Sequence, residues 1–126
     1  MTVRRRKPTE AELGILHVLW ARGPSTVRDV ATELGREGAY TTVLKLLQIM
    51  TEKRLVRRQE SGRLHIYTAA RSQDQTQRQL VQDLVHRVFH GSGARLVLQA
   101  LSASKASPDE LAEIQRLLDA RRRGGK

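Results

Sequence analysis

Hydrogen-bonding side chains recur along one side of residues 39–54, a stretch without Gly or Pro. The apolar residues of this stretch cluster on the opposite side at about 100° per residue, which predicts an amphipathic helix. These apolar residues are Val43, Leu46, Leu47 and Met50. Thr41, Lys45, Gln48 and Glu52 point to the opposite side. The N-terminal residues and the polar side together supply hydroxyl, ammonium and amide groups on Tyr40, Thr41, Thr42, Lys45 and Gln48. Such groups can bond to base edges in the major groove of DNA, and a merely solvated face is the alternative.

A second set of polar groups flanks Ser61-Gly62, where the sequence predicts a tight turn between strands at 55–60 and 63–68. The set consists of Arg57, Arg58 and Arg63. Guanidinium groups near the tip of a hairpin are suited to contacts with phosphates or the minor groove. The alternative is that these charges only protect strand edges from aggregation.

Two further helices are needed to hold the helix at 39–54. Thr9 and Glu12 have the spacing of a capping box, which predicts a helix over 9–21. Ser25 or Thr26 then caps a short second helix. Because three helices and a hairpin form a winged helix-turn-helix, we predict a mainly α fold with a small β-hairpin.

From residue 72 onward the pattern is helical, in three short amphipathic segments. The last begins at Ser107-Pro108-Asp109-Glu110, which combines an N-cap, a first-turn proline and a capping-box acid. Segments this short have too little bulk for a core of their own, so we expect them to pack against a second copy of the chain. The residues predicted at this dimer seam are Leu80, Leu84, Val88, Leu96, Leu111, Ile114, Leu117 and Leu118.

Charge divides the chain in the same way. The formal net charge is +10, and residues 1–71 hold 14 basic and 7 acidic side chains, against 5 and 6 in residues 72–120. We therefore predict a winged-helix DNA-binding domain at 1–71 with a basic N-terminal arm, and a helical dimerisation region at 72–126 with a basic C-terminal tail. Aromatic residues make up only 3%, too few for base stacking, so the expected partner is double-stranded DNA.

The two basic termini have plain alternatives. Arg4 to Lys7 could lie along phosphates or simply keep the chain soluble. Arg121 to Arg123 suit the negative end of the last helix. Binding of an acidic protein, as a winged-helix adaptor, is the alternative function for the whole basic surface.

Other kinds of chemistry find little support in the sequence. The chain has no cysteine, which excludes disulfides and thiolate metal sites. Asp83, His86 and His90 have a spacing that could hold a divalent metal, but exposed histidines are common, so we expect no metal. No nucleophile triad or phosphate-binding glycine loop is recognisable, so we expect no enzyme, no catalytic residue and no cofactor. The apolar run at 13–20 is too short to span a bilayer, and we expect a cytoplasmic protein without a membrane partner.

Several short segments match the pattern of a known family. They are Thr9-Glu10-Ala11-Glu12-Leu13, Leu19-Trp20, Ala39-Tyr40-Thr41-Thr42-Val43, Met50-Thr51-Glu52-Lys53, Gly62-Arg63 with Tyr67, and Phe89-His90-Gly91-Ser92 with Leu96-Val97. With these segments the chain resembles the penicillinase-repressor (BlaI/MecI) family of winged-helix transcriptional regulators, over about 9–118. The resemblance implies a homodimer that blocks transcription at an inverted-repeat operator, often with TACA and TGTA halves, and in which Thr41, Thr42 and Lys45 face the DNA.

Two regulatory routes of that family are affected by differences in this chain. Members that control β-lactam resistance are cut by a membrane sensor-protease at an Asn-Phe bond in the fifth helix, where this chain reads Gln99-Ala100. Whether a sensor-protease acts on this chain therefore stays open. Copper-responsive relatives use a C-terminal cysteine cluster, so the absence of cysteine excludes their mechanism here.

Overall fold

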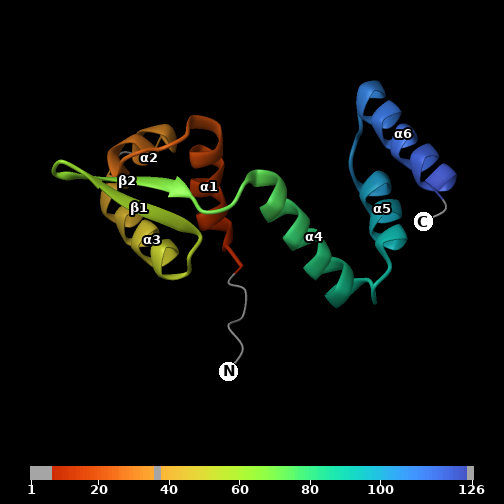
Figure 1. The fold of residues 1–126 in the computed structure, drawn as a ribbon, viewed down its shortest axis with the longest axis horizontal. Coiled ribbons are helices and arrows are strands. Elements are labelled where there is room, and N and C mark those ends of the chain that lie inside the picture. The colour runs from red at the N-terminus through yellow and green to blue at the C-terminus, as the bar shows by residue number, and fades with distance from the viewer. Residues whose placement is uncertain (1–6, 36–37, 125–126) are drawn as a thin grey trace. The chain divides into compact units, whose positions relative to one another are not determined.

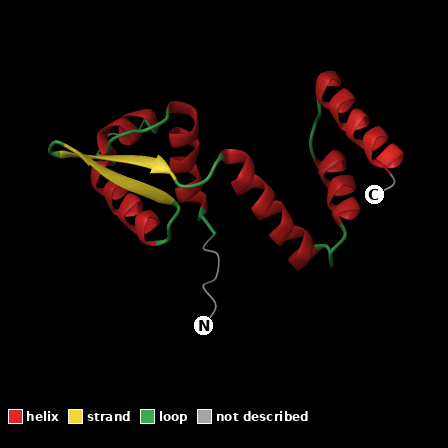
Figure 2. Cartoon of the chain, viewed as in Figure 1, coloured by secondary structure: helices red, strands yellow, loops and turns green. Residues whose placement is uncertain are grey.

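A computed structural model describes residues 7–35 and 38–124 of the chain. The described residues are mainly helical with one two-stranded antiparallel hairpin, as predicted (Figures 1 and 2). In chain order the elements are α1 (Glu10–Arg22), α2 (Val27–Glu33), α3 (Tyr40–Glu52), β1 (Val56–Ser61), β2 (Leu64–Ala69), α4 (Gln73–Val88), α5 (Gly93–Ala103) and α6 (Pro108–Gly124).

The chain forms two compact units, residues 1–81 and 82–126. The division between them falls inside α4, whereas the predicted functional boundary after residue 71 falls just before that helix. The functional boundary therefore stays a prediction. Arg4 to Arg6 of the predicted basic arm, and residues 36–37, lie outside the described residues.

The N-terminal unit is a winged helix-turn-helix built around one apolar core. Its fully or almost fully buried residues come from α1, α2, α3 and both strands: Ile15, Leu16, Leu19, Val27, Val30, Val43, Leu47, Met50, Val56 and Tyr67. The loop after α1 joins the hairpin through Ser25 and Tyr67, whose backbones exchange hydrogen bonds of 3.0 and 2.8 Å. The same core therefore fixes α3 and the hairpin together.

Reciprocal capping boxes begin several of the helices. The predicted box at Thr9 and Glu12 is confirmed, with hydrogen bonds of 3.2 and 2.9 Å. At α2 the cap is Thr26, with Asp29 as its partner, rather than Ser25. Ser25 is buried instead, and its hydroxyl donates to the carbonyl of Gly23. The choice between the two predicted caps is thus decided by the position of the acid three residues later.

A buried ion pair ties α1 to the end of α3. The Nζ of Lys53, which follows α3, lies 2.8 Å from Oε1 of Glu12, and Glu12 is only 2% exposed. Glu12 also accepts the backbone N–H of Thr9. One carboxylate therefore caps α1 and anchors α3 at the same time.

The hairpin differs from the prediction by one residue at its turn. Ser61 pairs with Leu64 as the last rung of the sheet, so the turn residues are Gly62-Arg63 rather than Ser61-Gly62. Gly62 has φ +64°, a conformation that favours glycine and suits the first central position of a two-residue hairpin turn. Arg63 thus lies in the turn, which projects beyond α1, α2 and α3 (Figure 1).

The helices that follow the hairpin have no buried residue of their own. None of the residues of α4, α5 or α6 that the structure describes is buried. The predicted start of α6 is confirmed, because Ser107 and Glu110 cap each other with bonds of 2.9 and 3.1 Å. No helix in the described ranges is long and apolar enough to cross a membrane.

Candidate nucleic-acid interface

Helix α3 has one buried face and one exposed face. Val43, Leu47 and Met50 are at most 2% exposed, which fixes the rotation of the helix about its axis. All five residues predicted to read bases lie on the exposed part of the helix: Tyr40, Thr41, Thr42, Lys45 and Gln48. Thr41, Lys45 and Gln48 form a stripe of hydrogen-bonding groups along the solvent side of α3, because they are four and three residues apart. Tyr40 and Thr42 flank this stripe at the start of the helix.

The three arginines of the hairpin do not form one cluster. Adjacent residues of a strand point to opposite faces, so Arg57 and Arg58 leave β1 on opposite sides. Arg58 pairs with Tyr67, and residues that are directly opposite each other point to the same face of the sheet. Arg58 therefore lies on the same face as Val56 and Tyr67, which are buried in the core. Arg63 lies in the turn itself. All three are exposed, but a single DNA backbone lying against one face of the hairpin can meet only one of Arg57 and Arg58.

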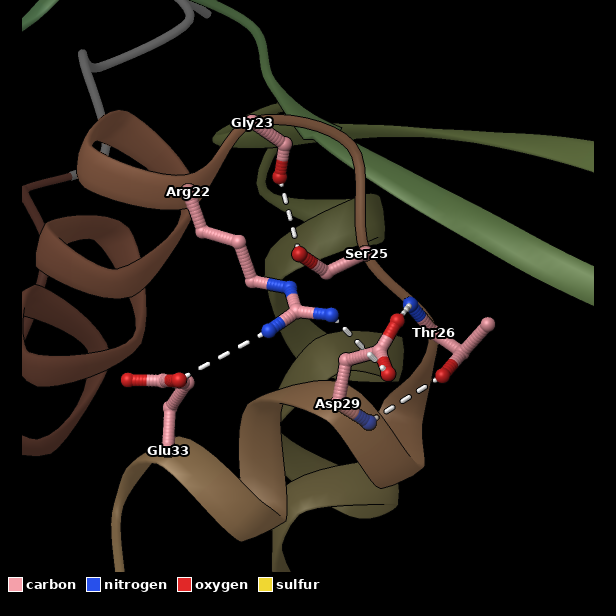
Figure 3. Close-up of polar contacts among 6 residues, drawn as sticks. All are labelled: Arg22, Gly23, Ser25, Thr26, Asp29 and Glu33. Carbon is pink, nitrogen blue, oxygen red and sulfur yellow. Dashed lines mark hydrogen bonds and ion pairs between the residues drawn. The ribbon is translucent and has the colours of Figure 1, made fainter.

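An ion-pair cluster fixes α2 against the end of α1 (Figure 3). The guanidinium of Arg22 lies between two carboxylates of α2, 3.3 Å from Asp29 and 3.6 Å from Glu33. The backbone N–H of Thr26 donates to the carboxylate of Asp29 and lowers its pKa. Burial raises the pKa by a smaller amount, whereas the hydroxyl of Thr26 and the charge of Arg22 lower it further. The cluster thus neutralises Arg22 and orients α2, the helix that precedes α3.

Most of the cations that the structure describes in this domain have no carboxylate partner. Among the described residues, Lys53 and Arg22 are paired with acidic side chains, whereas seven other basic side chains have no carboxylate within 4.0 Å. That group consists of Arg28, Lys45, Arg54, Arg57, Arg58, Arg63 and Arg71. The N-terminal unit therefore presents uncompensated positive charge on the same body as the polar face of α3.

One member of that group, Arg28, was not among the residues predicted from the sequence. Its Cζ lies 5.8 Å from the ring centroid of Tyr40, which places a cation against the first residue of α3. A cation–π contact at an exposed site is worth about 0.5–1 kcal/mol. The available signal was a cation in the first turn of α2, where the helix dipole is unfavourable to it.

The predicted dimer seam is accessible in the single chain. Its eight residues are exposed or half-buried, and Leu117 on α6 is 62% exposed. On α5 the prediction named Leu96, which is half-buried, and passed over Leu98, which is 63% exposed. Both residues belong to the wide apolar face of α5, so helical periodicity alone could not show which of them is the more exposed.

The structure also shows the surroundings of Asp83, one of the three residues with metal-ligand spacing, and of Gln99 and Ala100. Asp83 accepts a hydrogen bond of 2.8 Å from Arg87, and the described ranges hold no group of three His, Asp or Glu side chains that could bind a metal ion. Gln99 and Ala100, at the place of the family's cleavage site, are both exposed within α5.

Most of the chain is similar in sequence to known proteins. The sequence profile of the penicillinase repressor family matches residues 8–120. The transcriptional regulator BlaI of Mycobacterium tuberculosis is 30% identical over 112 residues, which are 86% of this chain and 80% of that protein. The penicillinase repressor of Bacillus licheniformis is 21% identical over 113 residues, 88% of each chain. Among solved structures, AbfR of Staphylococcus epidermidis is 13% identical with a TM-score of 0.46, covering 92% of this chain and 73% of that one. The chain belongs to the penicillinase repressor family.

Proposed function

We propose that the chain is a transcriptional repressor that binds double-stranded DNA as a homodimer at an inverted-repeat operator. The observation that carries the proposal is α3, whose apolar face is locked into the core while Thr41, Lys45 and Gln48 line the exposed side. The names of its relatives, a transcriptional regulator and a penicillinase repressor, support the same activity. The proposal assigns the chain no catalytic step and places it in the cytoplasm, with the DNA it controls.

Recognition would divide between α3 and the hairpin. The major groove is about 12 Å wide and admits a helix, so the N-terminal half of α3 can reach base edges. Thr41 and Thr42 are at that end, and the ammonium of Lys45 suits guanine O6 and N7. Arg63 at the turn suits a phosphate, which fixes register without reading sequence.

The dimer would form through the helices after the hairpin. Leu111, Leu117 and Leu118 are each nearly half exposed or more on α6, and Leu84 and Val88 are exposed on α4. Apolar side chains at such spacing are ordinarily buried in a larger assembly. A two-fold axis between copies would repeat the α3 face on the DNA with a spacing of about one helical turn, or a multiple of it.

Selection from a library of random duplexes, followed by footprinting, tests the proposal. We expect the protein to enrich one sequence with two inverted half-sites and to protect both of them. Binding to every duplex with the same affinity, and with no protected sequence, would contradict the proposal, because phosphate contacts alone carry no sequence information.

A further inference from the structure

Arg28 is a cation at a position where the helix does not favour one. It lies in the first turn of α2, where the positive end of the helix disfavours a cation. Its side chain is exposed, and no carboxylate of the described residues lies within ion-pair distance of it. The acids of α2, Asp29 and Glu33, are both engaged by Arg22 (Figure 3). The charge of Arg28 is therefore available to an anion outside the chain.

The guanidinium of Arg28 lies over the ring of Tyr40. The Cζ of Arg28 lies 5.8 Å from the ring centroid of Tyr40, the first residue of α3. Among the described residues no hydrogen bond holds the guanidinium, so this ring contact is what places a long, flexible side chain beside the start of α3. Thr41, the next residue, begins the polar stripe.

DNA supplies an anion at this place. When a recognition helix enters the major groove, the helix before it crosses the phosphate backbone. Arg28 belongs to that preceding helix and lies at the end of α3 that would enter the groove first. A guanidinium is a fork of N–H donors that matches phosphate oxygens.

We propose that Arg28 binds a backbone phosphate of the operator and that Tyr40 is a positioning residue for its guanidinium. Tyr40 then contributes to affinity through Arg28 and not by reading a base. This inference rests on the proposed DNA binding.

The test measures dissociation constants by fluorescence anisotropy, from 50 to 200 mM salt, on the duplex that the wild-type protein selects and on an unrelated duplex. Arg28→Ala should weaken binding to both duplexes by the same factor, because a phosphate contact is blind to sequence. One lost phosphate contact lowers the salt slope by about 0.9, so the affinity ratio of wild type to variant should shrink about 3.5-fold over this range of salt.

Arg78→Ala is the matched control, because it removes the same charge from an arginine that pairs with Asp74 on α4. This control should leave the salt slope unchanged. Thermal melts should show both variants folded, since both side chains are exposed.

Variants of Tyr40 separate positioning from base reading. Tyr40→Phe keeps the ring and should keep the affinity, whereas Tyr40→Ala should weaken both duplexes and should add nothing in the Arg28→Ala background. An unchanged salt slope for Arg28→Ala, or a Tyr40→Phe variant that prefers a different base, would overturn the inference. A wild-type protein that selects no sequence would refute the proposed function instead, so the two failures are distinguishable.

Discussion

Replacing Lys53 by Met would leave the carboxylate of Glu12 charged and buried without its partner. Glu12 is 2% exposed and Lys53 is 22% exposed, with 2.8 Å between Oε1 and Nζ. Removing one partner of a buried pair costs about 3–5 kcal/mol, and we expect about 3 kcal/mol because water still reaches Lys53. With a urea m-value of about 1.5 kcal/mol/M, the unfolding midpoint should fall by about 2 M at a fixed protein concentration.

Arg116→Met is the control, because Arg116 pairs with Glu113 on the exposed side of α6. Exposed pairs are worth about 0–1 kcal/mol, so this midpoint should move little. A second substitution, Glu12→Gln, tests whether the unpaired buried charge causes the loss of stability. Adding Glu12→Gln to Lys53→Met removes the buried charge but keeps an oxygen for the N–H of Thr9, so the double variant should be more stable than Lys53→Met alone. A further loss of stability on adding Glu12→Gln would refute this explanation.

Three other predictions concern DNA binding, assembly and pH. Lys45→Ala should lower affinity and selectivity in gel shifts, whereas Arg63→Ala should weaken all duplexes alike and reduce the salt slope by about one contact. Leu84→Asp or Leu117→Asp should give monomers with impaired DNA binding, and a fully dimeric variant in analytical ultracentrifugation would contradict the seam. The lowered pKa of Asp29 means that its stabilisation is complete above its ordinary value of 3.8 and is lost as pH falls through the lowered value. The melting temperature of Asp29→Asn should therefore lie below wild type at pH 6 and converge with it in strong acid, and an equal difference at both pH values would rule this out.

The parts of the fold that depend on neighbours in sequence were predictable. The caps of α1 and α6 follow a three-residue spacing, and the exposed side of α3 follows helical periodicity. The alternating directions of Arg57 and Arg58 could also have been read from strand geometry. The turn shifted by one residue because β1 is exposed on both faces next to the turn, so no buried face fixed the register there.

Contacts between distant residues were beyond sequence reasoning. Glu12 and Lys53 are 41 residues apart, and nothing in the local pattern joins them. The same holds for Arg28 and Tyr40, which meet only once α2 and α3 are packed. The candidate site was therefore predictable where it depends on one helix face, and not where a second element places a side chain beside that face.

Methylation interference on the selected duplex addresses the reading role of α3 most directly, because guanine N7 lies in the major groove. We predict symmetric interference in two half-sites, with the signal at one guanine of each half lost in Lys45→Ala while the other positions keep theirs. Interference confined to the minor groove, or a Lys45→Ala pattern identical to wild type at every guanine, would contradict the assignment of α3 as the element that reads the operator.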